Sequence, residues 1–268
     1  MLVLTAGGVD LRIPVVYTQV MVAGGAADLG SEAVKSALVA QTLKNEDFPV
    51  DFVDPFPVLA EDFIRVHDPK YVTAVLAGRD EFGGKFFGHS IETIRSFAFV
   101  GGAFLTGAKK ALEAKRAVVV AVLASGGQEV GWSRVDQVES DGPFNYLMVA
   151  AAHLIQHNQA QRIVILDTDP RGGSGTEDVL SQTGFGANIL YRPMSPTTSI
   201  EEDLARYQPD LIFYQVGSDE GLASEQMGRR DELVFTVAQT LGVPVVFNVT
   251  SDYLGAFSAA LRVHGPST

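Results

Sequence analysis

The sequence has no cysteine among its 268 residues. This absence excludes disulfides, thiolate metal sites and thiol nucleophiles, and it fits a cytoplasmic protein. No run of about 18 or more apolar residues occurs, so we expect no membrane-spanning helix. Residues 1–17 lack a basic segment and are interrupted by Gly7, Gly8 and Asp10, which favours strands over a signal peptide.

Positive charge is also scarce. The chain has 20 Lys and Arg residues against 32 Asp and Glu residues, which gives a formal net charge of −12. Because phosphate contacts need clusters of Lys and Arg, and none is visible, we expect no binding to nucleic acids or to anionic membranes. Apolar residues, in contrast, make up 46% of the chain. That content is ample for one large core, so we expect residues 1–268 to form a single domain.

Continuous apolar runs, each followed by polar residues, predict strands that are buried on both faces of a parallel sheet. Four such runs occur, at 117–123, 163–166, 210–216 and 243–249. Shorter strands are expected at 1–5, 14–22, 48–52 and 188–191. Between the strands we expect helices at 32–44, 57–66, 90–115, 145–157, 199–207 and 229–241, and one that ends near Val263. The alternation predicts an α/β fold with three αβα layers and a mostly parallel central sheet.

Local signals refine the helices. Ser31 and Ser199 are candidate N-caps, and Asp68 followed by Pro69 predicts another helix start. The glycine pair at 101–102 predicts an interruption of the long helix at 90–115.

Polar side chains follow each of the four buried runs. They are Ser125, the pair Asp167 and Asp169, Asp219, and the pair Asp252 and Tyr253. Because ligands bind at the carboxyl ends of parallel strands, we expect these residues to line one crevice.

The segment after the second run is the most informative one. Asp167 and Asp169 are followed by residues 170–175, Pro-Arg-Gly-Gly-Ser-Gly, which predict a loop. Two carboxylates this close need a positive partner, which could be a metal ion or Arg171. Alternatively, the aspartates only cap backbone amides in a turn, or Arg171 and the glycine amides form an anion pocket.

Several segments, taken in order, resemble motifs of the histone deacetylase and acetylpolyamine amidohydrolase family, which belongs to the arginase/deacetylase superfamily. They are Arg65–Tyr71, Phe144-Asn145, Asp167–Thr176, Pro209–Asp219 and Pro244–Tyr253. The resemblance covers nearly the whole chain and implies an arginase/deacetylase-like fold.

The resemblance also implies a zinc site, and here the sequence departs from the family. The zinc ligands would be Asp169, Asp219 and a histidine, but Arg171 takes the place of the histidine. Arginine stays protonated and offers no lone pair to a metal. We therefore expect the zinc site to be lost, with Arg171 bridging the two aspartates. Asp167 resembles a family residue that helps to hold a structural potassium ion, so potassium near Asp167 is a further expectation.

The family's pair of catalytic histidines should follow the glycines at 126–127. The sequence instead has Gln128-Glu129-Val130 there. Only the tyrosine that polarises the substrate carbonyl has a counterpart, Tyr253. This pattern favours a catalytically inactive pseudoenzyme that acts as a binding or structural subunit, either in a homo-oligomer or beside an active relative.

The alternative is a hydrolase of C–N amide bonds with altered chemistry. Its metal, manganese or magnesium, would be held by Asp169, Asp219 and Asp252. A carboxylate from the loop at 128–144 would act as the base, and the candidates are Glu129, Asp136, Glu139 and Asp141.

Histidines are few, and two of them have a spacing used for metal binding. His153 and His157 lie four residues apart, which places two imidazoles on one face of a helix. The apolar pattern of that helix predicts that the pair lies towards its exposed side. His67 belongs to the segment at 65–71, and we expect it to be a packed or capping residue.

Overall fold

The structure is a computed structural model. It describes residues 12–23, 25–46, 48–79, 90–114, 118–133, 142–169, 172–194, 199–217, 223–249 and 254–264, with the main chain alone for residues 25–33. The expected strand at residues 1–5 lies outside these ranges.

The described strands form one seven-stranded sheet in which every neighbouring pair is parallel. Their order across the sheet is β2-β1-β3-β7-β6-β4-β5. The strands are β1 (Ile13–Val16), β2 (Val50–Val53), β3 (Val119–Val122), β4 (Ile163–Asp167), β5 (Ile189–Pro193), β6 (Leu211–Val216) and β7 (Val245–Val249). The four predicted buried runs are β3, β7, β6 and β4. They lie side by side in the middle of the sheet, so their carboxyl ends share one edge.

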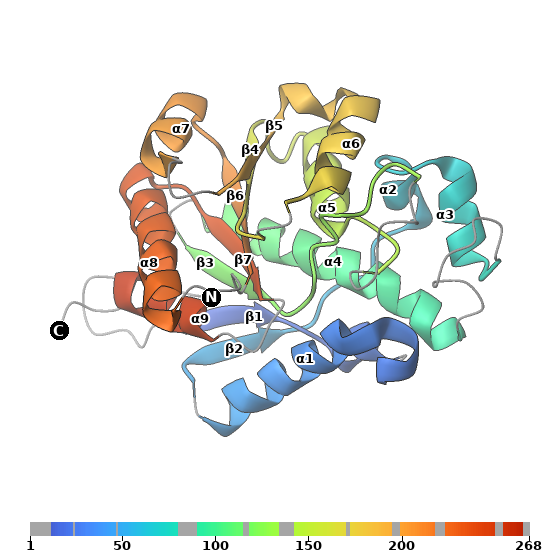
Figure 1. Cartoon of the computed structure of the whole chain (residues 1–268), viewed down its shortest axis with the longest axis horizontal. Helices are drawn as coiled ribbons and strands as arrows, with labels where there is room; N and C mark the ends of the chain where they lie inside the picture. Colours follow the sequence, from blue (N-terminus) through green and yellow to red (C-terminus); the bar gives the residue numbers. More distant parts are fainter. Residues whose placement is uncertain are drawn as a thin grey trace.

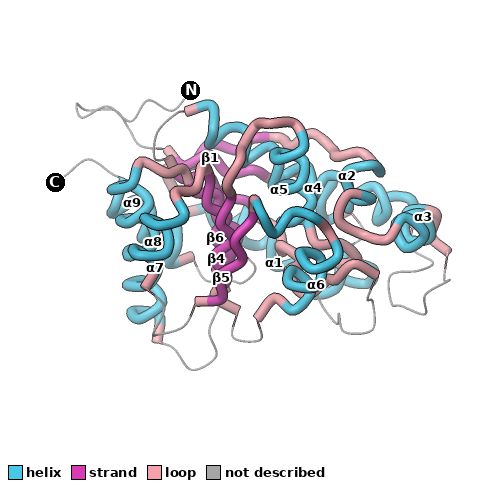
Figure 2. The backbone as a smooth tube through the Cα atoms, turned by 90° about the horizontal axis from the view of Figure 1, so that it is seen from above, coloured by secondary structure: helices cyan, strands magenta, loops and turns pink. Residues whose placement is uncertain are grey.

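Helices cover both faces of this sheet (Figure 1). They are α1 (Gly25–Asn45), α2 (Ala60–Ile64), α3 (Pro69–Leu76), α4 (Ile91–Glu113), α5 (Tyr146–Gln156), α6 (Ser174–Gln182), α7 (Ile200–Tyr207), α8 (Ser224–Leu241) and α9 (Gly255–His264). Short 3-10 turns are η1 (Gln19–Val22) and η2 (Gly184–Ala187). Figure 2 shows α7, α8 and α9 on one side of the strands and α4, α5 and α6 on the other. The predicted α/β fold with three αβα layers is therefore confirmed.

Two consecutive residues of β7 show how the layers are packed. The side chain of Val246 points towards α4, where Gly107 allows the helix to approach the sheet closely. Phe247 points the opposite way and contacts Phe235 of α8 and Phe257 of α9 at ring-centroid distances of 5.5 and 5.2 Å. Because strand side chains alternate between faces, an apolar run without polar interruptions can bury both sides.

Three of the predicted boundaries are wrong. The strand expected at 14–22 ends at Val16, and Gln19–Val22 forms the turn η1 instead. Helix α1 begins at Gly25, so Ser31 lies within the helix and is not its N-cap. Helix α8 begins at Ser224, five residues before the predicted start, because Glu225, Gln226 and Met227 are good helix formers.

A fourth prediction, a loop that continues to Gly175, is also wrong at its end. Helix α6 starts at Ser174. The glycines hide this start from the sequence pattern, although Glu177 in the first turn favours a helix N-terminus. Asp68 caps α3 as predicted, since its carboxylate accepts hydrogen bonds from the N–H groups of Lys70 and Tyr71. Ser199 precedes α7 but makes no side-chain cap bond.

The glycine pair at 101–102 does not interrupt α4, contrary to prediction. A Cβ at Gly102 would collide with the carbonyl oxygen of Phe56, whose segment crosses the helix at this point. The neighbouring Val58 N–H donates to the Ala98 carbonyl of α4 at 3.0 Å. The glycines therefore allow a close crossing of two backbones and do not break the helix.

None of the helices in the described ranges has both the length and the apolar character needed to cross a membrane.

Candidate functional site

The carboxyl end of β4 carries the buried carboxylate of Asp167, which is 1% exposed. Its Oδ1 accepts a hydrogen bond from the Asp169 N–H at 2.9 Å, and its Oδ2 accepts one from the Tyr191 hydroxyl at 2.7 Å. Burial raises the pKa of Tyr191 far above its ordinary value, and the negative charge of Asp167 raises it further. Tyr191 is therefore a permanent hydrogen-bond donor, and Asp167 serves here as an acceptor.

The second aspartate meets the loop that follows β3. The Nε2 of Gln128 donates a hydrogen bond to Oδ2 of Asp169 at 3.1 Å. Gln128 is 2% exposed, so the amide is held among protein atoms. This contact joins the two segments that the sequence analysis singled out, the Asp-x-Asp strand end and the loop where catalytic histidines were expected.

The same loop is fastened to the start of α6. The Gln128 carbonyl oxygen accepts hydrogen bonds from the Thr176 N–H at 2.8 Å and from the Thr176 hydroxyl at 3.1 Å. A Cβ at Gly175 would collide with the backbone of Glu129 and Val130. Glycine at 175 therefore allows the first turn of α6 to approach the backbone of the loop after β3 closely.

His67, which precedes α3, holds these loops through two hydrogen bonds to their backbone. It is fully buried; its Nε2 accepts the Asn145 N–H at 3.0 Å, and its Nδ1–H donates to the Gly131 carbonyl at 2.9 Å. Burial lowers the pKa of His67 to about 4, so the ring is neutral near pH 7. The expectation of a packed histidine is confirmed. Asn145 extends the network, because its side-chain amide donates to the Thr176 hydroxyl at 3.0 Å.

Three polar residues form a row across β4, β6 and β7, near the carboxyl ends of these strands. Asp167, Gln215 and Asn248 occupy the same register on β4, β6 and β7, so their side chains point to the same face. All three are at most 1% exposed. A Cβ at Gly126 would collide with the Gln215 Oε1 and with Leu147 of α5. Gly126 therefore packs directly against Gln215, the middle residue of this row.

The described residues include one member of the expected zinc set, Asp169, and lack Arg171 and Asp219, so the expected loss of the zinc site stays a prediction. They contain no group of three or more His, Cys, Asp or Glu side chains arranged to hold a metal. The described member of the expected zinc set, Asp169, has one carboxylate oxygen engaged by the Gln128 amide nitrogen, which has no lone pair for a metal. A potassium ion at Asp167 would have to share oxygens that already accept N–H and O–H donors.

Of the remaining predicted site residues, the structure describes two and leaves the others outside its described ranges. Glu129 is half-buried in the same loop as Gln128. Ser125 lies three residues after the end of β3, and its Oγ accepts a hydrogen bond from the Gly127 N–H at 3.3 Å. The others lie outside the described residues: Arg171, Asp219, Asp252 and Tyr253, with Asp136, Glu139 and Asp141 from the alternative hypothesis. The bridge between Arg171 and two aspartates stays a prediction.

Sequence reasoning missed the side chains that satisfy the two aspartates. Tyr191 lies on the neighbouring strand β5, and no pattern near Asp167 points to it. Gln128 was noted only as a replacement for a histidine. Its position directly after Gly126-Gly127 was the available signal, but its bond to Asp169 depends on how the loop folds back.

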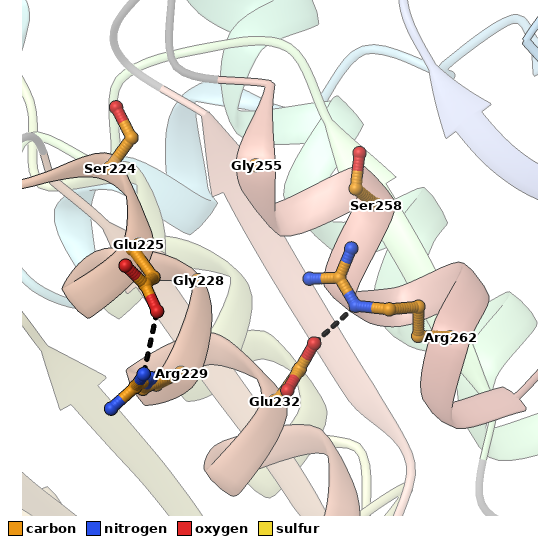
Figure 3. A pocket seen from close by; sticks show the side chains of 8 residues that line it. All are labelled: Ser224, Glu225, Gly228, Arg229, Glu232, Gly255, Ser258 and Arg262. Carbon is orange, nitrogen blue, oxygen red and sulfur yellow. Dashed lines mark hydrogen bonds and ion pairs between the residues drawn. The ribbon is translucent and has the colours of Figure 1, made fainter.

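A separate hollow of about 500 Å³ lies between α8 and α9 (Figure 3). It is lined by Ser224, Glu225, Gly228, Arg229, Glu232, Gly255, Ser258 and Arg262. Arg229 pairs with Glu225 at 2.6 Å, and Arg262 pairs with Glu232. The hollow shares no residue with the predicted site.

Comparisons with known proteins agree with this architecture. The fold is similar to the crystal structure of the HDA15 HD domain, with a TM-score of 0.69 and 13% sequence identity; the alignment covers 96% of this chain and 89% of that chain. At this identity the likeness shows the fold alone. No curated protein matches the chain by sequence. The family model of the histone deacetylase domain matches residues 31–200, which is more than half of the chain. The protein therefore belongs to the histone deacetylase domain family.

Proposed function

We propose that this protein is a catalytically inactive member of the histone deacetylase family that acts as a binding or structural subunit. The observation that carries the proposal is the hydrogen bond from the Gln128 amide to Asp169. It places an N–H donor on one oxygen of an expected metal-binding carboxylate, and the donor comes from the loop where the catalytic base was expected.

The chemistry of these side chains supports the proposal. Metal-assisted amide hydrolysis needs a Lewis acid that polarises the carbonyl and a base that accepts a proton from water. A carboxamide does not titrate, and its nitrogen cannot bind a metal. Arginine at position 171 cannot replace a histidine ligand for the same reason.

A second candidate keeps hydrolysis with altered chemistry. Glu129 follows Gln128 in the same loop and is half-buried, so it is the described carboxylate nearest in sequence to this contact that could act as a base. In that case Asp169 would bind an oxygen-preferring ion such as manganese or magnesium. The two candidates differ in whether Asp169 is needed for any activity.

The test is hydrolysis of an acetyl-lysine peptide and of an acetylpolyamine, each with added zinc or manganese. If the protein is catalytically inactive, wild type, Asp169→Asn and the matched exposed variant Asp54→Asn should all show no hydrolysis above the buffer control. Metal-dependent turnover by wild type and Asp54→Asn that Asp169→Asn abolishes would overturn the proposal and favour the hydrolase.

A subunit role requires a partner, either further copies of this chain or an active relative. Light scattering of the purified chain should show an assembly larger than a monomer. If the chain is strictly monomeric, a pull-down with a catalytically active family member tests the second arrangement.

A further inference from the structure

The end of α5 brings two imidazole rings together. His153 and His157 stack with ring centroids 4.1 Å apart and planes at 23°. The side chain of His153 is 15% exposed, and His157 is exposed. The spacing of four residues predicted a shared helix face, and the structure confirms that this face is open to solvent at His157.

Hydrogen bonds fix which nitrogen of each ring carries a proton. The Nδ1 of His153 lies 2.9 Å from Oδ1 of Asp62, and the Nδ1 of His157 lies 2.8 Å from the His153 carbonyl oxygen. Both partners can only accept, so each Nδ1 is the donor, and in the neutral ring each Nε2 keeps its lone pair. In the part of the chain that the structure describes, no group hydrogen-bonds either Nε2.

Asp62, the hydrogen-bond partner of His153, is buried and is itself held by a backbone hydrogen bond. It is 3% exposed, and its Oδ2 accepts the Leu59 N–H at 2.9 Å. Burial alone would raise the pKa of Asp62, but hydrogen bonds from His153 and Leu59 outweigh it and hold the pKa below its ordinary value. A carboxylate behind a histidine is the usual arrangement that orients a metal-binding imidazole and increases its basicity.

The charge around the pair contains one favourable and one opposing contribution. The carboxyl end of a helix carries a partial negative charge, which stabilises a cation beside the last turn of α5. Arg65 opposes a cation, since its Nε lies 3.5 Å from Oδ1 of Asp62. Two protein ligands and a nearby guanidinium together limit the affinity to a modest value.

We propose that the Nε2 atoms of His153 and His157 bind one divalent transition-metal ion with a preference for imidazole, of the class Zn²⁺, Cu²⁺ or Ni²⁺. Water completes the coordination, because the described residues supply two protein ligands and no third one. The site lies at the end of α5 and does not involve Asp169.

The test is calorimetric titration of the full chain with Zn²⁺ alone. Wild type should bind one ion in the micromolar range, and His157→Ala should weaken binding by about tenfold or more. His157 is exposed, so its replacement leaves the fold intact. Gln156→Ala, an exposed neighbour on the same helix, should bind like wild type, and Arg65→Gln should bind more tightly.

A second readout identifies the ligands. Cu²⁺ added to wild type should give an electron paramagnetic resonance spectrum with coupling to two imidazole nitrogens, and His157→Ala should lose at least one of them. Unchanged Zn²⁺ affinity in His157→Ala, or wild-type binding that only Asp169→Asn removes, would overturn the proposal. The latter result would mean that Zn²⁺ binds at Asp169, and it would count against the proposed loss of the metal site at the carboxyl edge of the sheet.

Discussion

Two regions of this protein hold side chains with metal-binding chemistry, and they treat them in opposite ways. At the carboxyl edge of the sheet, Asp167 and Asp169 accept hydrogen bonds from Tyr191, Gln128 and the backbone. At the end of α5, protein acceptors hold the Nδ1 atoms of His153 and His157, and among the described residues no group hydrogen-bonds either Nε2. Whether a side chain can bind a metal therefore depends less on whether it occupies a family ligand position than on whether its lone pairs are available.

The largest expected effect is on the free energy of unfolding, when a histidine is replaced by alanine in each of the two regions. His67→Ala removes the partners of the Asn145 N–H and the Gly131 carbonyl and opens a cavity, so it should cost about 3–4 kcal/mol of the free energy of unfolding. His157→Ala removes an exposed ring and should cost about 0.5 kcal/mol or less. Urea unfolding at pH 7 with a metal chelator measures both. Equal losses would contradict the account of His67 as the support of the sheet-edge loops.

The pH dependence of stability sharpens the same comparison. Burial lowers the pKa of His67 to about 4 from 6.5, so between these values the unfolded chain binds a proton that the folded chain excludes. Stability is therefore full above about pH 6.5, falls as the pH drops towards about 4, and loses on the order of 3 kcal/mol over that window.

His67→Gln provides the control for this pH effect. It removes the titrating ring and should flatten the profile between pH 6.5 and 4, while His264, whose pKa is also lowered to about 4 by burial, continues to contribute in both proteins. Identical slopes for wild type and variant, measured by urea midpoints across the window, would show that His67 titrates freely in the folded state.

A smaller effect tests the loop contact that places Gln128. Gly175→Ala puts a Cβ into the backbone of Glu129 and Val130, and the resulting strain should cost about 2 kcal/mol. Gly184→Ala is the matched control, because a Cβ there meets nothing within 4 Å; it should change stability by about 0.5 kcal/mol or less. If thermal melts show the same small change for both variants, the close approach at Gly175 is not a constraint.

Much of the fold follows from the sequence, because a buried parallel strand is a local pattern. The four apolar runs became the four central strands, and Asp68 with Pro69 marked the start of α3. Two glycines are exceptions, since Gly102 and Gly175 allow contacts between distant segments and do not mark a helix break or a loop. Such contacts leave no periodic signal in the chain.

The candidate site was only partly predictable for the same reason. Asp167 and Asp169 are visible in the sequence as a strand end followed by glycines. Their partners depend on how β5 pairs with β4 and how the loop after β3 folds onto α6, so Tyr191 and Gln128 could not be assigned as partners from local sequence. The histidine pair shows the converse, because a helix spacing of four residues is local and survives into the structure.

The most direct test of the central claim is the zinc content of the full chain after equilibration with zinc and dialysis, measured by plasma mass spectrometry. The His157→Ala background removes the proposed surface site from the count. In that background we predict a zinc content near zero, unchanged by Asp169→Asn. About one tightly held zinc per chain, lost on addition of Asp169→Asn, would show that the sheet edge still binds metal and would contradict the account.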